Sequence, residues 1–344
     1  HVERRTTNCK FILALIFAII ISFSRSRYRV GVASFIVTWN ALGVVGWEDF
    51  QGIHHDPISS VPSLLGGGQQ QQLQDFAAPP PLLFLPLAGF TLSAPALALL
   101  LVFKTNTSYQ RWDEARKAWE TVKNNSRSIA RQTTVWVYES DQLTDQEKYR
   151  LMRRVADALW LFPRTLQTHL LHPVEDEDAY RRDIRARVEY RPLAEELSIA
   201  RHKPTLALFE LSCALNQLPL DTFQRTTIDA QVTDMCNAMG VCDRIFVSPV
   251  PVIYTRFLAR FVELFMAFVP FALYEPFAES WNHWAMIPTS LVLGFFFLGI
   301  EELAIQLEEP FSVLPLAKIV SGIGLSVEEH VQWMETELGG KTGP

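Results

Sequence analysis

The chain has 344 residues, of which 49% are hydrophobic and 20% are charged, and its 31 basic and 37 acidic side chains give a net charge of −6. Its aromatic content and modest net charge exclude an intrinsically disordered chain, and its acidic balance argues against a nucleic-acid binder. Charged residues are scarcer than the about 25% typical of soluble chains, and several stretches have none. The sequence therefore predicts a membrane protein with a large water-facing part.

The N-terminal segment carries a short apolar run, Phe11 to Phe23, that follows several basic residues. A mostly apolar run of 13 residues is too short to span a bilayer, and the pattern is typical of a signal-peptide core or an interfacial helix. We therefore expect residues 1–24 to be a targeting or peripheral segment.

The first membrane helix is predicted over residues 25–50. Its uncharged stretch runs from Val30 to Trp47 and is preceded by three arginines. Residues 51–81 follow, with the runs GGGQQQQLQD and PPP, and this composition indicates a low-complexity loop.

The second membrane helix, residues 82–106, gives the strongest signal in the chain. Leu82 to Phe103 contains 22 residues without a charge, enough for a hydrocarbon core of about 30 Å. Pro86 and Pro95 interrupt the stretch, which membrane helices tolerate when the freed carbonyls find other partners. The apolar pattern becomes charged within one turn and without a breaker. We therefore expect this helix to leave the bilayer and continue into a soluble bundle.

Residues 107–242 are predicted to form that soluble helical bundle, because they are polar, charged and helical in pattern. Trp112, Trp119 and Val122 have helical spacing, and His202-Lys203-Pro204 begins another helix. No β-rich stretch interrupts the pattern. The predicted fold class is all-α: a polytopic membrane protein with four transmembrane helices and a helical soluble bundle.

Two more membrane helices are predicted, over residues 243–276 and 284–300. The former includes Arg256, Arg260 and Glu263, which one helical face can hold and which we expect to face protein or water instead of lipid. Residues 301–344 form the soluble C-terminal segment.

Motifs for catalysis or metal binding are weak. His169 and His172 have i, i+3 spacing but no evident third ligand, so we expect no metal site. The four cysteines have no CxxC spacing and are interpreted as buried free thiols. The glutamates that follow the last span, beginning with Glu301 and Glu302, are read either as cation ligands or, preferably, as a water-facing helix end. We predict no enzyme activity and no cofactor.

The segment FKTNTSYQRWDEARKAW, which follows the second apolar run, resembles the hallmark of the bestrophin-like anion channels. Two later passages, residues 244–255 and 299–311, are similar to the family's segments at its third and fourth membrane helices. The residues of all three segments are most similar to those of the plant and algal plastid branch of the family. The resemblance covers roughly residues 29–319.

The resemblance implies a homopentamer whose central pore is lined by the second membrane helix. It also implies an apolar neck, which on this chain falls at Pro95, Leu99 and Phe103. These residues share one helical stripe, with steps of about 6 Å. An apolar stripe can equally pack against neighbouring helices, and the residues alone leave both interpretations open.

Charges beside the neck have two interpretations. Lys104, Arg111 and Arg116 can focus anions, whereas for Arg111 and Arg116 we prefer pairing with Asp113, Glu114 or a carboxylate after the last span. The resemblance further implies a lower constriction near residues 220–223, for which we choose Phe223.

The resemblance to the plastid branch also implies the partners and the location. We expect chloride or bicarbonate as the permeant ion, contact with membrane lipid, no nucleic acid, and a plastid membrane, the chloroplast thylakoid. Only Glu308 and Glu309 stand where animal members carry a calcium clasp, so we expect no calcium gating. The alternatives are a cation-conducting relative and a non-conducting membrane scaffold.

Overall fold

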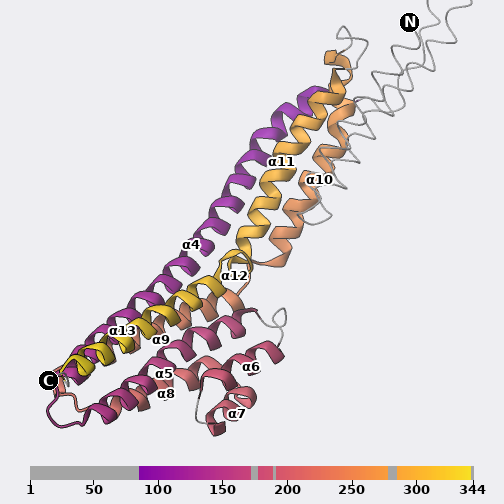
Figure 1. Cartoon of the computed structure of the whole chain (residues 1–344). Coiled ribbons are helices and arrows are strands. Elements are labelled where there is room, and N and C mark those ends of the chain that lie inside the picture. Colours follow the sequence, from indigo (N-terminus) through magenta and orange to yellow (C-terminus); the bar gives the residue numbers. More distant parts are fainter. Residues whose placement is uncertain (1–84, 172–176, 189–190, 278–284, 342–344) are drawn as a thin grey trace, which may run out of the picture. The chain divides into compact units, whose positions relative to one another are not determined.

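The computed structural model describes residues 85–171, 177–188, 191–277 and 285–341, and within these ranges it is helical with no strand (Figure 1). The predicted all-α class is confirmed for this part of the chain. The predicted segments 1–24, 25–50 and 51–81 lie outside the described residues. The chain divides into two compact regions, which we treat separately.

The first region, called the apolar region, takes its described residues from 85–107, 250–277 and 285–305. It contains the first part of α4 (Leu87–Glu139), then α10 (Val252–Leu273), the 3-10 turn η1 (Glu275–Phe277) and most of α11 (Met286–Glu308). One small cluster of buried side chains joins the three helices: Leu97 and Leu101 of α4, Leu258, Val262, Met266 and Val269 of α10, and Leu298 of α11. The spacing of three and four residues places each set on one helical face.

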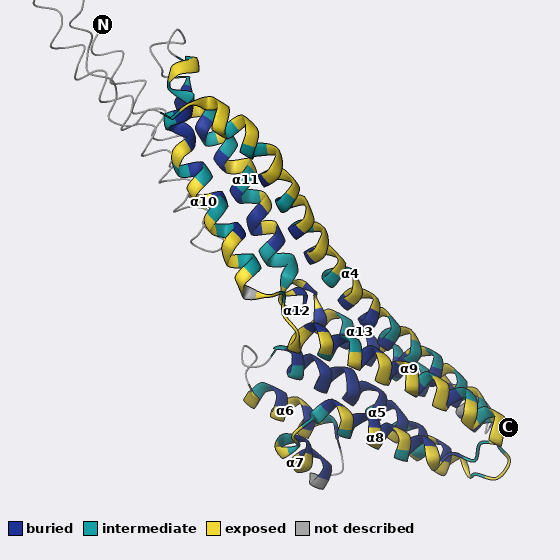
Figure 2. Cartoon of the chain, turned by 180° about the vertical axis from the view of Figure 1, so that it is seen from behind, coloured by how far each residue is buried: buried dark blue, intermediate teal, exposed yellow. Residues whose placement is uncertain are grey.

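The second region, called the bundle region, takes residues 108–249 and 306–341. It contains the rest of α4 and six longer helices: α5 (Asp145–Leu171), α6 (Glu177–Arg187), α7 (Arg191–Ile199), α8 (Lys203–Asn216), α9 (Thr222–Val247) and α13 (Leu316–Lys341). The short α12 (Pro310–Val313) precedes α13. Helix α5 lies against both α8 and α13 and is buried along most of its second half (Figure 2).

Side-chain caps fix where the bundle helices begin. At α9, the Asp221 carboxylate accepts from the Gln224 N–H at 2.8 Å, and the Asp221 N–H donates to the Gln224 side chain at 3.0 Å. At α5, Thr144 donates to the Glu147 carboxylate through both its hydroxyl and its N–H. These reciprocal bonds satisfy N–H groups that a helix start leaves without partners. The predicted helix after His202 is confirmed as α8, with His202 as its N-cap.

The boundaries differ from the sequence prediction in instructive places. Helix α4 is continuous from Leu87 to Glu139, which confirms that the apolar helix runs on into charged sequence. Residue 243, predicted to open the third membrane helix, lies inside α9, and the break comes at Ser248 to Pro251. Two prolines in that break remove backbone donors and end the helical pattern.

The four-span count stays a prediction. Among the described residues, two helices, α4 and α11, are long and apolar enough to cross a membrane. Helix α10 forms as predicted but contains Arg256, Arg260 and Glu263, all exposed on this chain. The expectation that these charges face protein or water instead of lipid stays a prediction. Helix α11 runs past residue 300 to Glu308, so the predicted end of the fourth helix is too early.

Candidate functional site

The stripe predicted as a neck lies on the open face of α4. Leu99 and Phe103 are 55% and 56% exposed, and Pro95 is exposed as well. Leu97 and Leu101, on the opposite face, are 0% and 2% exposed because they pack on α10 and α11. Within the described residues, no helix covers the stripe, and the alternative in which it packs against neighbouring helices stays open. An exposed apolar stripe favours a lipid, a protein partner or a pore beside it.

Pro95 changes the polarity of that same face. Proline has no N–H, so it cannot donate the helical bond to the carbonyl of Thr91, four residues earlier. Thr91 is exposed, on the same side of the helix as Pro95. A carbonyl released in this way costs several kcal/mol against lipid but little against water or a neighbouring donor. The local backbone chemistry therefore favours a hydrated or protein-covered face over a lipid-facing one.

About one turn beyond Leu101, the buried face of α4 carries a charge. Lys104 is 3% exposed, and its ammonium lies 3.8 Å from the carboxylate of Glu301 on α11, which is also buried. At that distance the two charges attract each other but lie beyond hydrogen-bond length. The side chain points to the packed face of the apolar region and away from the exposed stripe. The anion-focusing role of Lys104 stays a prediction, with this ion pair as its context.

Glu301 and Glu302 are not the water-facing helix end that the sequence suggested, because they are 7% and 8% exposed inside α11. Sequence reasoning missed Glu301 as the partner of Lys104. The available signal was its spacing: Glu301 follows the buried Leu298 by three residues and precedes the buried Ala304 by three, so it continues the packed face.

Arg111 holds backbone carbonyls at two helix ends of the bundle region. Its guanidinium donates to the Ile245 carbonyl at 2.8 Å, the Ser248 carbonyl at 2.9 Å and the Glu308 carbonyl at 3.5 Å. The first two lie at the C-terminus of α9, and the third is the last residue of α11. These termini carry unpaired carbonyls and partial negative charge, which a cation offsets. The predicted carboxylate partner is therefore replaced by carbonyls, and focusing by Arg111 stays a prediction.

Arg116 pairs with a nearby carboxylate, as the second interpretation predicted. Its guanidinium lies 3.9 Å from the Asp113 carboxylate and stacks over the Trp112 ring at 5.7 Å. Lys117 also binds Asp113, and this hydrogen bond, with the carboxylate charge, raises the pKa of Lys117. The hallmark segment thus satisfies many of its charges within α4 itself.

Phe223, the residue chosen for the lower constriction, lies in the first turn of α9 and is 79% exposed. It lies two residues after the Asp221 cap, so the backbone beneath it is fixed while its ring is exposed. The neighbouring Leu220 packs partly against the core of the bundle region. The constriction role of Phe223 stays a prediction.

A family model described as "Bacterial/Fungal Bestrophin protein" matches residues 69–329. The chain is 30% identical over 247 residues to voltage-dependent chloride channel 1, chloroplastic, of Arabidopsis thaliana, covering 71% of this chain and 56% of that protein. The chain thus spans just over half the length of this relative.

A bacterial relative and a solved structure agree with that match. A voltage-dependent anion channel-forming protein of Synechocystis is 30% identical over 244 residues, which are 69% of this chain and 75% of that protein. A crystal structure of a mutated bacterial bestrophin homologue from Klebsiella pneumoniae is 25% identical, with a TM-score of 0.65 over 76% of this chain and 93% of that one.

Proposed function

The chain belongs to the bestrophin family, and from this premise we propose that it forms a channel that conducts anions passively across a membrane. One observation carries the proposal: α4 packs one face against α10 and α11 and leaves the stripe of Pro95, Leu99 and Phe103 open. A helix arranged in this way is suited to line a shared space between copies of the chain.

We propose a homopentamer with this stripe around its axis. Five copies would stack three apolar rings over about 12 Å, since each four-residue step rises about 6 Å. Narrow apolar constrictions gate by dewetting. The edges of the Phe103 rings carry the positive side of the aromatic quadrupole, which tolerates an anion. Pro95 and Leu99 are not aromatic, which favours passage of bicarbonate as well as chloride.

The remaining site residues have roles in this proposal. Arg111 contributes positive potential beyond the neck, because its partners are carbonyl dipoles and not a neutralising carboxylate. Lys104 contributes less, because Glu301 offsets its charge. Phe223 forms a second apolar ring, for which its open, capped position is suitable. The name of the Arabidopsis relative places that protein in the chloroplast, and we propose a plastid membrane, the thylakoid, for this chain.

The proposal is tested by reversal potentials of the purified full chain in planar bilayers with asymmetric KCl. Anion conduction predicts a reversal near the chloride equilibrium potential, and replacing chloride with bicarbonate measures their relative permeability. A reversal near the potassium potential would make the protein a cation channel and overturn the anion assignment. Absence of current from protein that reconstitutes as an oligomer would favour a scaffold.

A further inference from the structure

In the bundle region, three helix ends bring together two imidazoles and a carboxylate. His169 lies in the last turn of α5, His202 caps α8, and Asp243 lies near the end of α9. The His169 Nε2 is 3.1 Å from one oxygen of Asp243, and the His202 Nε2 is 3.3 Å from the other. The three donor atoms all lie within 4.8 Å of one another. The two imidazole rings are 4.7 Å apart.

The spacing of these atoms fits a metal ion. Zinc bonds nitrogen and oxygen at about 2.0–2.1 Å in a tetrahedron, which separates neighbouring ligand atoms by about 3.3 Å. The two nitrogen–oxygen distances are close to that value but involve the two different oxygens of Asp243, and the three ligand atoms lie within 4.8 Å of one another, so side-chain rotations would have to bring them to one ion. The side chains are 25%, 37% and 27% exposed for His169, His202 and Asp243, so solvent reaches the cluster and a water can complete the fourth position.

The second nitrogen of His202 already has a partner that suits metal binding. Its Nδ1 accepts the cap bond from the Thr205 N–H at 3.4 Å and lies 2.7 Å from the Thr205 hydroxyl. Metal binding through Nε2 uses the other neutral tautomer, in which Nδ1–H donates to the Thr205 hydroxyl and the cap bond from the Thr205 N–H is given up. Metal-bound histidines usually donate their other N–H in this way, which fixes the ring orientation and strengthens the ligand.

The charges around the cluster also favour a cation. Asp243 lies four residues before the end of α9 at Val247, and His169 lies two before the end of α5 at Leu171. A helix C-terminus carries partial negative charge, so a carboxylate there is unfavourable without a positive partner. The cation nearest in sequence, Arg244, is paired instead with Glu114 at 2.9 Å. A divalent ion would offset both the carboxylate and the two helix ends.

We propose that His169, His202 and Asp243 bind one divalent transition metal of the Zn²⁺ class per chain. The ion would join α5, α8 and α9 and so stabilise the bundle region. Imidazole and carboxylate ligands suit zinc, whereas calcium and magnesium prefer oxygen ligands alone. Sequence reasoning rejected a metal at His169 because it sought ligands nearby in the chain. The site is independent of conduction, so its failure would leave the channel proposal untouched.

The test is calorimetric titration of ZnCl₂ into the full chain in detergent, purified without a histidine tag. The adjacent pair His54 and His55 should be replaced by alanine in every sample to remove a competing ligand pair. We expect one saturable site per chain, no comparable binding of Mg²⁺, and a rise in melting temperature on adding zinc. Substituting Co²⁺ should give the visible absorption of a four-coordinate site.

Two variants locate the site. His202→Asn retains a capping oxygen for α8, and Asp243→Asn retains the size of the side chain. Each should weaken zinc binding by at least about tenfold, the lower end of what loss of even an outer-shell partner costs. His330→Asn, on α13, is the matched control and should bind as before. Circular dichroism without zinc checks that each variant folds.

Unchanged affinity in either ligand variant, or no saturable binding to the parent chain, would overturn the proposal. If a variant does not fold, X-ray absorption at the zinc edge of the parent chain decides instead. Scattering from two imidazoles supports the site, and a shell without imidazole contradicts it.

Discussion

The apolar region and the bundle region differ in how much of their apolar side-chain surface is buried by helices of the same chain. In the bundle region, the second half of α5 is almost wholly buried by helices of the same chain. In the apolar region, only 17% of the most apolar 18-residue stretch of α4 is buried, and large apolar side chains are exposed on α4, α10 and α11. Among the described residues, the bundle region buries its own core, whereas the helices of the apolar region leave many large apolar side chains exposed.

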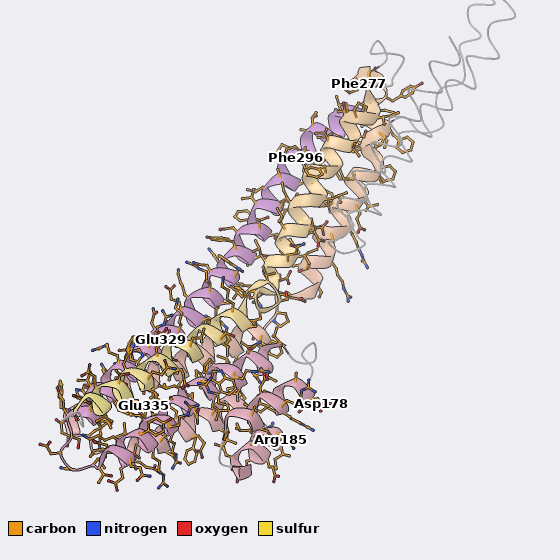
Figure 3. The ribbon with its side chains drawn as sticks, viewed as in Figure 1. Asp178, Arg185, Phe277, Phe296, Glu329 and Glu335 are labelled. Carbon is orange, nitrogen blue, oxygen red and sulfur yellow. The ribbon has the colours of Figure 1, made fainter. Side chains whose placement is uncertain are left out.

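Charge follows the same division. Figure 3 shows Glu329 and Glu335 projecting from α13, while Phe296 is exposed on the uncharged part of α11. In the bundle region, the side chains of Arg153 and Glu328, paired at 2.6 Å, are each 32% exposed. The pair of Lys104 and Glu301 in the apolar region is buried. Buried pairs are costly to break, whereas exposed pairs contribute little.

The largest expected effect follows from that contrast. Lys104→Met or Glu301→Gln leaves a buried charge without its ion-pair partner and should destabilise the protein by about 3–5 kcal/mol. The double variant Lys104→Met/Glu301→Leu removes both charges and should recover most of the loss. Arg153→Met, which breaks the partly exposed pair with Glu328, is the control and should cost far less. Thermal unfolding in detergent measures all four. Equal losses in the single and double variants would contradict a direct pairing.

The closed interior of the bundle region is tested by two thiols of α9. Cys242 is buried, and burial, with a smaller contribution from Asp243, raises its pKa from 9.0 to about 12. Cys236 is exposed, which corrects the expectation that every cysteine is buried. Because the thiolate reacts, a rise of about three pH units lowers the reactive fraction about a thousandfold at pH 8.

Single-cysteine variants that retain either Cys236 or Cys242 should therefore label with maleimide at very different rates. The Cys242 thiol stays protonated as pH rises from 7 to 9, so its labelling should remain slow across this interval. Rapid labelling of Cys242 in folded protein would mean that the bundle region opens readily, and the contrast between the two regions would fail.

Close helix packing in the bundle region is tested by two glycines of α13. A Cβ on Gly324 would meet the Trp160 ring at 2.9 Å and the Arg187 guanidinium at 3.2 Å, and Arg187 already stacks on that ring at 4.8 Å. Gly324→Ala should overpack this site and cost about 1–3 kcal/mol. A Cβ on Gly322 meets nothing within 4 Å, so Gly322→Ala should gain about 0.5–1 kcal/mol through helix propensity. Melting temperatures that shift in the same direction would contradict the contact.

The sequence predicted what local pattern controls. The continuity of α4 through FKTN was predictable because no proline or glycine interrupts it there, and α8 was predictable from Pro204 at its first turn. The neck residues were chosen by resemblance. Their exposure depends on which face of α4 packs against other helices. Because the helix is apolar on all sides there, the sequence does not show which face that is.

Partners that come from distant segments were not predictable. Arg111 and three carbonyls, Lys104 and Glu301, and His169 with its two neighbours all meet through tertiary packing. In each case sequence reasoning looked for partners nearby in the chain, where periodicity can place them. Carbonyl acceptors leave no sequence signal at all, because every residue has one.

The proposed pore-lining role of the exposed face of α4 is tested by measuring channel current. Leu99→Ala and Phe103→Ala widen the proposed apolar rings and should raise leak current roughly tenfold, which corresponds to about 1.4 kcal/mol of barrier. Phe296→Ala, an equally exposed apolar residue on α11, is the control and should leave current unchanged. Bilayer recordings at matched protein density measure this. Unchanged currents in both neck variants would remove the neck from Leu99 and Phe103.

The smallest effect is expected on the open side of α11. Phe296 is 60% exposed, and if lipid or detergent covers it, Phe296→Ala should change stability by less than about 0.5 kcal/mol. Leu298, two residues along the same helix, is 3% exposed, and Leu298→Ala should cost about 2–5 kcal/mol because it leaves a cavity. Thermal unfolding in detergent compares the two. A large loss for Phe296→Ala, with a change in oligomer size, would instead make this face of α11 a contact between copies.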